Sequence, residues 1–287
     1  MLFIFENIKL YNIMTKKEVE FKSVVAETLL IPLYMRAKES RRGEGAILED
    51  SMAESLVESI KYDYSKFDNA PMSEVGCVIR GWYFDNAVSK FIESHRNPIV
   101  VNVGCGLDTR YQRIGDLGNA KFYAMDLPEV IELRKRLIPE PKNECYIAVS
   151  ILETEWLDFL KEKHPNGNFI FVIEGVIMYF YEDQVKEILH NIATRFSGGE
   201  LWFDVCGVMM YNKGLKPDSM NKVEANIRSG INKGSAIEIW EPHLRLIRQD
   251  NYMKFFRSRW GFLFGQILGR IPWLCYKFSS LLGYKIN

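Results

Sequence analysis

The chain has 287 residues, of which 47% are hydrophobic and 26% are charged. This composition excludes a disordered chain and is typical of a globular protein with a sizeable core. The 37 basic and 37 acidic residues cancel, so no overall field favours nucleic acid or a charged membrane, and we expect a small-molecule ligand.

The five cysteines and four histidines carry no disulfide or metal-ligand spacing. We therefore expect no metal site and a reducing, cytoplasmic location. The first residues, up to Met14, are apolar but are interrupted by Glu6 and Lys9 and lack the pattern of a secretory signal. No apolar run approaches the roughly 18 residues of a membrane span.

The first 97 residues predict a helical cap and lead-in helices. Apolar residues at helical spacing fill 51–67, behind an N-cap serine, and 77–95, before Asn97-Pro98. The charged, glycine-bearing stretch 39–50 precedes them and indicates a surface loop.

Short apolar strands alternate with helices from Ile99 onward. Strands are expected at 99–103, 122–125, 145–149, 169–173 and 201–205, and helices at 108–114, 128–137, 153–162 and 182–195. This alternation predicts an α/β fold with a parallel sheet that is covered on both faces. The pattern loosens near 207–240, which indicates an insertion, and later strands are expected at 244–248 and 284–286. We expect one domain, 1–287, with a Rossmann-like core over 98–287.

Glycines and an acid follow the first two strands. Gly104, Cys105 and Gly106 form a turn in which the backbone can approach a ligand and present N–H groups at a helix start. Asp126 ends the second strand, 20 residues after Gly106, the position of the acid that binds ribose hydroxyls. The alternative is that Asp126 only caps the helix that starts at Pro128.

The next strand ends complete a candidate ligand set. Ser150 and Ile151 follow the third strand, where a backbone N–H and an apolar side chain can meet an adenine. Glu174 follows the fourth strand and suits an ammonium group, with a helix cap or an ion pair as the alternative. Arg80, on the helix before the first strand, suits a carboxylate or is a solvated charge. An adenosine that carries an amine and a carboxylate is S-adenosylmethionine.

Other ligands and roles stay open at this point. Thr109 replaces the third glycine of the dinucleotide fingerprint, which disfavours a nicotinamide oxidoreductase without excluding it. The histidines at 95, 164, 190 and 243 lie away from the strand ends, so no catalytic base is assigned. The candidates for lining an acceptor pocket are Tyr34, Tyr179, Tyr211 and Asp204, each with core packing as the alternative.

Several motifs in order resemble the leucine carboxyl methyltransferase family, and within it the polyketide O-methyltransferases. They are ETLLIPLYMRAKES, VVNVGCGLDTRYQRI, YAMDLPEVIELRKRLIP, IEGVIMYFYEDQV and EIWEPHLRLI. The resemblance extends from about Glu27 to the C-terminus. It implies a class I methyltransferase with S-adenosyl-L-methionine as cofactor and S-adenosyl-L-homocysteine as product. The implied fold is a seven-stranded sheet whose last strand is antiparallel, plus a helical N-terminal cap.

The resemblance also implies residue roles. Arg80 would bind the methionine carboxylate, Gly104 would lie beside the methionine, Asp126 would bind the ribose and Glu174 would lie near the amino group. Many relatives have Asp-Leu where this chain has Ser150-Ile151, which puts a side-chain contact to adenine there in doubt. Arg36 or Lys38 would replace an early lysine that some relatives place at the pocket.

We therefore predict an O-methyltransferase for a small, polyketide-like or aromatic acceptor with a hydroxyl or carboxyl group. The alternatives are a protein C-terminal carboxyl methyltransferase and a non-catalytic module that binds adenosyl ligands. Neither a nucleic-acid nor a membrane partner is expected, whereas a homodimer is an open possibility. The aromatic C-terminal segment, with Trp260, Phe262, Phe264 and Trp273, is expected to pack on the domain or on a second subunit rather than on a membrane.

Overall fold

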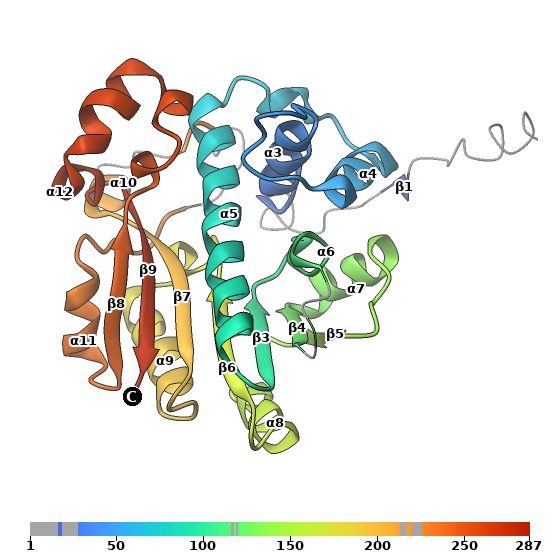
Figure 1. Ribbon diagram of the computed structural model, residues 1–287, viewed down its shortest axis with the longest axis vertical. Coiled ribbons are helices and arrows are strands. Elements are labelled where there is room, and N and C mark those ends of the chain that lie inside the picture. Colours follow the sequence, from blue (N-terminus) through green and yellow to red (C-terminus); the bar gives the residue numbers. More distant parts are fainter. Residues whose placement is uncertain (1–16, 19–27, 116–117, 119, 213–216, 220–225) are drawn as a thin grey trace, which may run out of the picture.

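A seven-stranded sheet forms the centre of the molecule in a computed structural model that describes residues 17–18, 28–115, 118, 120–212, 217–219 and 226–287 (Figure 1). Its strand order is β5-β4-β3-β6-β7-β9-β8. The strands are β3 (Pro98–Val103), β4 (Lys121–Asp126), β5 (Glu144–Ala148), β6 (Asn168–Ile173), β7 (Glu200–Cys206), β8 (Leu244–Asp250) and β9 (Ser279–Ile286).

The first five strands of this sheet are parallel, and β9 runs antiparallel to both β7 and β8. This arrangement confirms the predicted class I sheet with an antiparallel last strand. All six residues of the interior strand β3 are buried, because helices cover both faces of the sheet.

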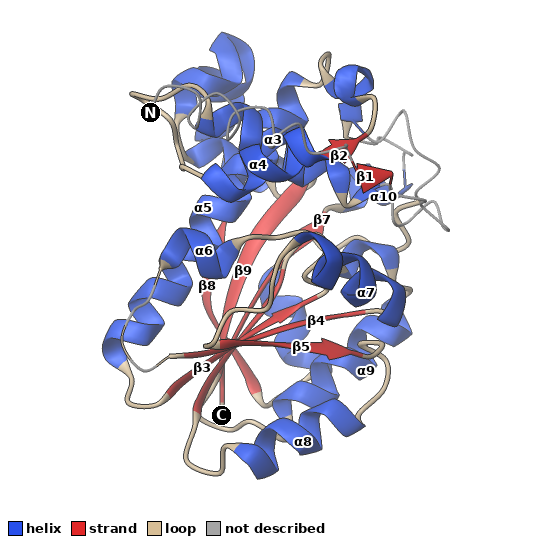
Figure 2. Ribbon diagram, turned by 90° about the vertical axis from the view of Figure 1, so that its right-hand side faces the viewer, coloured by secondary structure: helices blue, strands red, loops and turns tan. Residues whose placement is uncertain are grey.

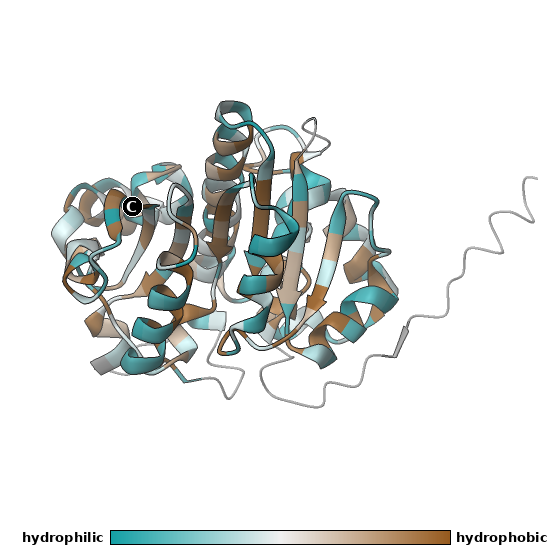
Figure 3. Cartoon of the chain, turned by 90° about the horizontal axis from the view of Figure 1, so that it is seen from below, coloured by the Kyte–Doolittle hydropathy of each residue, from teal (hydrophilic) through white to brown (hydrophobic). Residues whose placement is uncertain are grey.

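Helices lie on both sides of the sheet, as the edge-on view in Figure 2 shows. α5 (Pro71–Ser94) and α6 (Arg110–Ile114) pack on one face, and α8 (Glu155–Lys163) and α9 (Glu182–Ala193) on the other. Apolar residues concentrate along the strands, whereas the outer turns of the helices are hydrophilic (Figure 3). The remaining helices of the core are α7 (Pro128–Leu137), α10 (Val208–Asn212) and α11 (Ile237–Trp240), with the 3-10 turns η2 (Ile177–Tyr179) and η4 (Gly234–Ala236).

Two further groups of helices stand over the carboxyl ends of the parallel strands (Figure 1). One contains α3 (Leu30–Ser40) and α4 (Ser51–Ser59). The other, which we call the C-terminal lobe, spans residues 252–278 and contains η5 (Tyr252–Lys254), η6 (Arg257–Trp260), η7 (Phe262–Ile267), η8 (Leu268–Arg270) and α12 (Pro272–Cys275). Arg259 joins them, because its Nη1 donates to Oε1 of the fully buried Glu39 on α3 over 2.8 Å.

Several element bounds differ from the sequence expectations. α4 ends at Ser59 because Ile60 takes an extended conformation. After α4 come the short strand β2 (Ile60–Lys61) and the turn η1 (Tyr64–Phe67). β2 pairs with β1 (Lys17–Glu18). α5 begins at Pro71 rather than at residue 77, and α3 runs on to Ser40 into the expected loop.

The last strand is also longer than expected. β9 begins at Ser279 instead of at residue 284 because Gly283 lies inside it rather than before it. A Cβ at Gly283 would lie 2.6 Å from the Trp202 ring of the neighbouring strand, so the glycine allows the indole to pack there. Within the described residues, no helix combines the length and the apolarity that crossing a membrane requires.

Candidate cofactor and acceptor site

A cavity of about 720 Å³ opens at the carboxyl ends of the parallel strands, under α3 and the C-terminal lobe. Its volume is within the usual range of small-molecule sites. All eight residues that the sequence proposes for the cofactor line this cavity: Arg80, Gly104, Cys105, Gly106, Asp126, Ser150, Ile151 and Glu174. The fold therefore brings together residues from four strand ends and one helix.

The glycine turn after β3 requires its glycines. Gly104 and Gly106 have φ values of 67° and 50°, which residues other than glycine rarely adopt. A Cβ at Gly104 would also overlap the Val176 side chain, and one at Gly106 would lie 2.9 Å from Leu29 Cδ2. The buried Cys105 between them donates its N–H to the Met125 carbonyl over 2.9 Å, which ties the turn to β4.

Asp126 lies beside this turn. Its Oδ2 accepts the Gly106 N–H over 2.8 Å, and its Oδ1 accepts the Leu127 N–H over 2.8 Å. No side chain caps the N-terminus of α7. Asp126 therefore does not cap this helix, which was the alternative to a role in ligand binding. Burial raises the pKa of Asp126 above the ordinary value of 3.8, although the two N–H groups oppose that shift.

The Ser150–Ile151 turn follows β5, which ends at Ala148. The Ser150 N–H donates to the Glu153 carboxylate over 3.1 Å, and the Ser150 hydroxyl oxygen accepts the Leu152 N–H over 3.2 Å. The Val149 N–H donates to the Asp126 carbonyl, which holds this turn next to the acid. The N–H of Ser150 thus serves the turn itself, whereas its hydroxyl keeps its hydrogen as a donor. The adenine contact at Ser150–Ile151 therefore stays a prediction.

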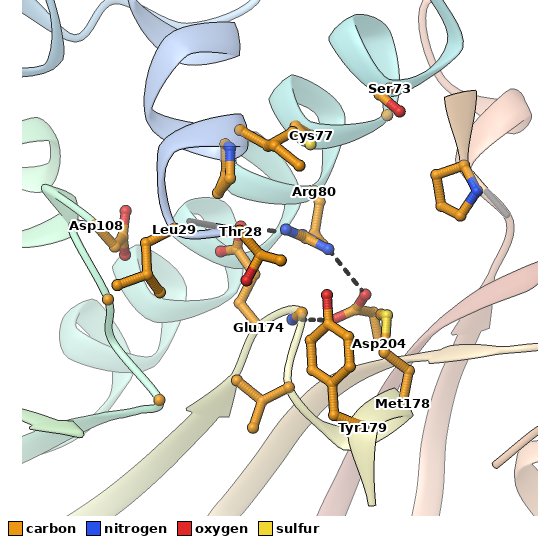
Figure 4. Close-up of a pocket in the computed structure, with 18 of the residues that line it drawn as sticks. Thr28, Leu29, Ser73, Cys77, Arg80, Asp108, Glu174, Met178, Tyr179 and Asp204 are labelled. Carbon is orange, nitrogen blue, oxygen red and sulfur yellow. Dashed lines mark hydrogen bonds and ion pairs between the residues drawn. The ribbon is translucent and has the colours of Figure 1, made fainter. Parts of the chain in front are cut away.

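Arg80 is held between two carboxylates at the middle of the cavity (Figure 4). Its Nε lies 3.1 Å from Glu174 Oε1, and its Nη1 lies 3.2 Å from Asp204 Oδ2. Burial opposes the charge on Arg80, but Asp204 and Glu174 outweigh it and raise the pKa of the guanidinium. A Cβ at Gly175, whose φ is 70°, would lie 2.8 Å from Arg80 Nη2, so this glycine allows the guanidinium to approach.

Glu174 has a second arginine that the sequence reasoning missed. Arg110 Nη2 donates to Glu174 Oε2 over 2.5 Å, and the same guanidinium bonds Asp85 and Asn102. Glu174 therefore forms ion pairs, which were the alternative to ligand binding, and it also lines the cavity. Arg110 is identifiable in the sequence only as one of three charges in DTRYQR; its burial comes from the packing of α6 against α5.

Acidic groups outnumber basic groups in the described lining. The arginines are Arg36 and Arg80, and the carboxylates are Asp108, Asp126, Glu174, Asp204 and Asp218. Arg36 lies at the cavity, whereas Lys38 pairs with Glu74 on the outer side. Buried Arg110 and Arg113 pair with Glu174 and Asp108 from behind the lining. The carboxylates that remain still suit a ligand with cationic groups better than an anionic pyrophosphate, because like charges repel at these distances.

The side of the cavity under the C-terminal lobe is largely apolar. We call it the acceptor side, in contrast to the donor side formed by 104–108, 125–127, 149–151 and 174–176. Its apolar residues come from distant segments: Met72, Cys77, Met178, Cys206, Met210, Met253, Trp260, Phe264 and Phe278. Sequence reasoning missed the methionines and cysteines among them, because each by itself is an ordinary core residue.

One polar group on the acceptor side closes the start of α5. The Asp218 carboxylate accepts the N–H groups of Met72 and Ser73, each over 2.9 Å. It also accepts the Ser73 hydroxyl, while the Ser219 hydroxyl bonds Ser73 Oγ over 2.8 Å. The residue at the N-cap, Ala70, makes no side-chain bond, so a distant loop supplies the cap of this helix.

The lining offers no side chain that is both basic and unpaired among the described residues. None of the four histidines lines the cavity, and His243 Nδ1 instead lies 2.5 Å from Glu241. Burial raises the pKa of Tyr179 to about 12 and also raises the pKa values of Tyr252 and Cys77. Tyr34 bonds Asp68, and Tyr211 is exposed; neither lines the cavity, whereas Tyr179 and Asp204 do.

Comparison with known proteins extends the geometric evidence. The sequence pattern of the family described as leucine carboxyl methyltransferase matches residues 30–193. The tetracenomycin polyketide synthesis O-methyltransferase TcmP of Streptomyces glaucescens is 29% identical over 225 residues, which is 78% of this chain and 82% of that protein.

One further relative agrees in name, and one solved structure agrees in fold. A protein of Mycobacterium sp. strain JLS, provisionally named an S-adenosyl-L-methionine-dependent methyltransferase, is 26% identical over 63% of this chain and 65% of its own length. The crystal structure of a DUF574 family protein from Streptomyces avermitilis superposes with a TM-score of 0.59 at 10% identity, covering 92% of this chain and 100% of that one; this likeness concerns the fold alone. Because the family pattern spans more than half of its residues, the chain belongs to the leucine carboxyl methyltransferase family and is an S-adenosyl-L-methionine-dependent methyltransferase.

Proposed function

We propose that this chain methylates an oxygen atom of a small, largely apolar acceptor. The observation that carries the proposal is the apolar acceptor side, which adjoins a donor side rich in carboxylates within one cavity. The relative TcmP is named as an O-methyltransferase of polyketide synthesis, which supports a polyketide-like or aromatic acceptor here.

The donor-side residues fit S-adenosyl-L-methionine. Asp126 can accept hydrogen bonds from both ribose hydroxyls, and Gly104 and Gly106 line the cavity with backbone atoms. Arg80 offers a guanidinium for a carboxylate, and Glu174 offers a carboxylate for an ammonium group. When bound, the cofactor supplies a methyl group on a sulfonium, a group that is already activated for attack by an oxygen.

The acceptor side contributes position and exclusion of water. The aromatic rings of Trp260 and Phe264 and the thioethers of Met178 and Met253 can hold an apolar body against the donor side, and alignment of this kind supplies much of the rate of a displacement reaction. A carboxyl acceptor is already ionised at neutral pH and needs no base, whereas a phenol with a pKa near ~10 gains from one. Since the described lining lacks an unpaired base, we favour a carboxyl oxygen over a hydroxyl oxygen.

The test is a matched acceptor series. Aromatic acids, the corresponding phenols and a peptide that ends in leucine are incubated with the protein and S-adenosyl-L-methionine, and S-adenosyl-L-homocysteine formation and product mass are followed. We expect methyl esters of the aromatic acids, which mild alkali hydrolyses. Formation of phenol methyl ethers instead would show that the enzyme prefers a hydroxyl oxygen. Methylation of the peptide alone would support the protein carboxyl methyltransferase, and cofactor binding without turnover of any acceptor would support the non-catalytic module.

A further inference from the structure

The outward side of the C-terminal lobe is apolar. Phe262 is 76% exposed, Leu263 54%, Ile267 44% and Trp273 65%. We call these four side chains the apolar face of the lobe. Leu263 and Ile267 are four residues apart in the single-turn π-helix η7 and therefore lie on the same side of it. Of the four aromatic residues that were expected to pack on the domain or on a second subunit, Trp260 and the cavity-lining Phe264 pack on the domain, whereas Phe262 and Trp273 are exposed.

The lobe is also strongly basic. Residues 252–278 contain five lysines and arginines and no aspartate or glutamate, in a chain whose total charge is zero. Lys254 and Arg259 pair with Asp250 and Glu39, which lie outside the lobe. For Arg257, Arg270 and Lys277, no carboxylate of the described residues lies within ion-pairing distance.

The cations stand next to the apolar face. Arg270 is exposed at the end of η8, between Ile267 and Trp273 in the sequence, and Lys277 Nζ lies 4.9 Å from the centre of the Trp273 ring. Exposed aromatic and aliphatic side chains with basic neighbours and no acid are the pattern by which a protein surface binds anionic lipid. Tryptophan in particular favours the level of the headgroups.

We propose that the C-terminal lobe docks on an anionic lipid bilayer, with its apolar face in the interfacial layer and Arg270 and Lys277 against the headgroups. A second copy of the chain fits the same surface less well. A twofold interface would set the apolar face against itself and would bring the unpaired cations of both copies together without any acid in the lobe to offset them. A bilayer supplies the missing negative charge.

The docking inference does not depend on the identity of the acceptor. If the proposed function also holds, docking has a consequence for it, because Trp260 and Phe264 line the acceptor side from within the same lobe. The acceptor side would then lie close to the bilayer, where apolar molecules concentrate.

The test is sedimentation of the full chain with lipid vesicles. We compare vesicles of phosphatidylcholine with vesicles that also contain phosphatidylglycerol, at low and high salt. Binding is expected only to the anionic vesicles and should weaken as salt rises. The double variant Phe262→Ser, Trp273→Ser should bind roughly tenfold more weakly or worse, and Arg270→Gln about fivefold more weakly.

A matched control removes an exposed apolar side chain outside the lobe. Ile239 on α11 is 81% exposed, and Ile239→Ser should bind vesicles like the unchanged protein. Binding of S-adenosyl-L-methionine by each variant shows that the fold is intact. The proposal is overturned if the unchanged protein does not bind anionic vesicles, or if the double variant binds them equally well. It is also overturned if the double variant only dissociates a dimer, measured by sedimentation equilibrium, without affecting vesicle binding.

Discussion

The donor side and the acceptor side of the cavity are built in different ways. Apart from Arg80 on α5, the donor side comes from one stretch, 104–176, in which a turn follows each of four successive strands. The acceptor side comes from Met178 and from segments near 72–77, 204–219 and 252–279, which are far apart in the sequence. Charged and hydrogen-bonded groups hold the donor side in place, whereas apolar packing forms most of the acceptor side.

Because of this difference, the donor side can be recognised from local sequence patterns and the acceptor side cannot. A turn with positive φ demands glycine, and a ribose demands an acid at a set distance, so such requirements leave local marks in the sequence. An apolar pocket demands only side chains of suitable volume, which do not differ from those of any core. Substitutions on the two sides should therefore affect different measurements.

The largest effect is expected at the network beneath the donor side. Arg110→Met would leave one oxygen of Glu174 without its buried cation, while Asp85 would keep only Arg113. Breaking a buried pair of this kind costs about 3–5 kcal/mol. The free energy of unfolding, from denaturant titration, should fall by that amount. Arg270→Met, at an exposed position, should change it by less than about 0.5 kcal/mol. A similar small change for Arg110→Met would mean that water or relaxation replaces the ion pairs.

The next effect concerns the cofactor. Asp126→Ala should weaken binding of S-adenosyl-L-methionine by roughly 1.5–3 kcal/mol, because a charged acceptor of hydrogen bonds is lost. Calorimetric titration measures this change. Glu129→Ala, at an exposed position at the start of α7, is the matched control and should bind normally. Unchanged affinity in a folded Asp126→Ala variant would remove Asp126 from the ribose site.

A smaller and more selective effect is expected at Arg80. Arg80→Lys keeps the positive charge between Glu174 and Asp204 but loses the planar fork that can bind a carboxylate with two hydrogen bonds. Binding of S-adenosyl-L-methionine should weaken about tenfold, or 1.4 kcal/mol, whereas binding of adenosine should not change, because adenosine has no carboxylate. Equal losses for the two ligands would give Arg80 a structural role only.

The smallest effect should fall on the acceptor side. Asp218→Ala removes the cap of α5 and should lower the free energy of unfolding by about 0.5–2 kcal/mol. It should also raise KM for the acceptor and leave cofactor affinity unchanged, since Asp218 borders only that side. Asp183→Ala, whose side chain is 99% exposed at the start of α9, serves as the control. A loss of cofactor affinity in Asp218→Ala would show that the two sides are not separate.

Much of the fold followed from the sequence, since the predicted strands and core helices are present with shifted ends. The shifts have particular causes. α5 begins before its apolar pattern does, because Pro71 and the Asp218 carboxylate form its start. The first part of β9 was not predicted, because Gly283, which accommodates the Trp202 ring, interrupts its apolar pattern. Glu174 was recognised as a candidate, but its second arginine was not, because Arg110 becomes buried only when α6 packs on α5.

The parallel sheet, the glycine turn and the position of Asp126 could be predicted from the sequence, because backbone conformation and strand burial depend on neighbouring residues. The packing of the folded chain is needed to see how Arg80 is shared between Glu174 and Asp204, and which methionines and aromatic rings line the acceptor side. The same packing leaves Phe262 and Trp273 exposed and buries Trp260. These outcomes depend on contacts between residues far apart in the chain, and local patterns do not record such contacts.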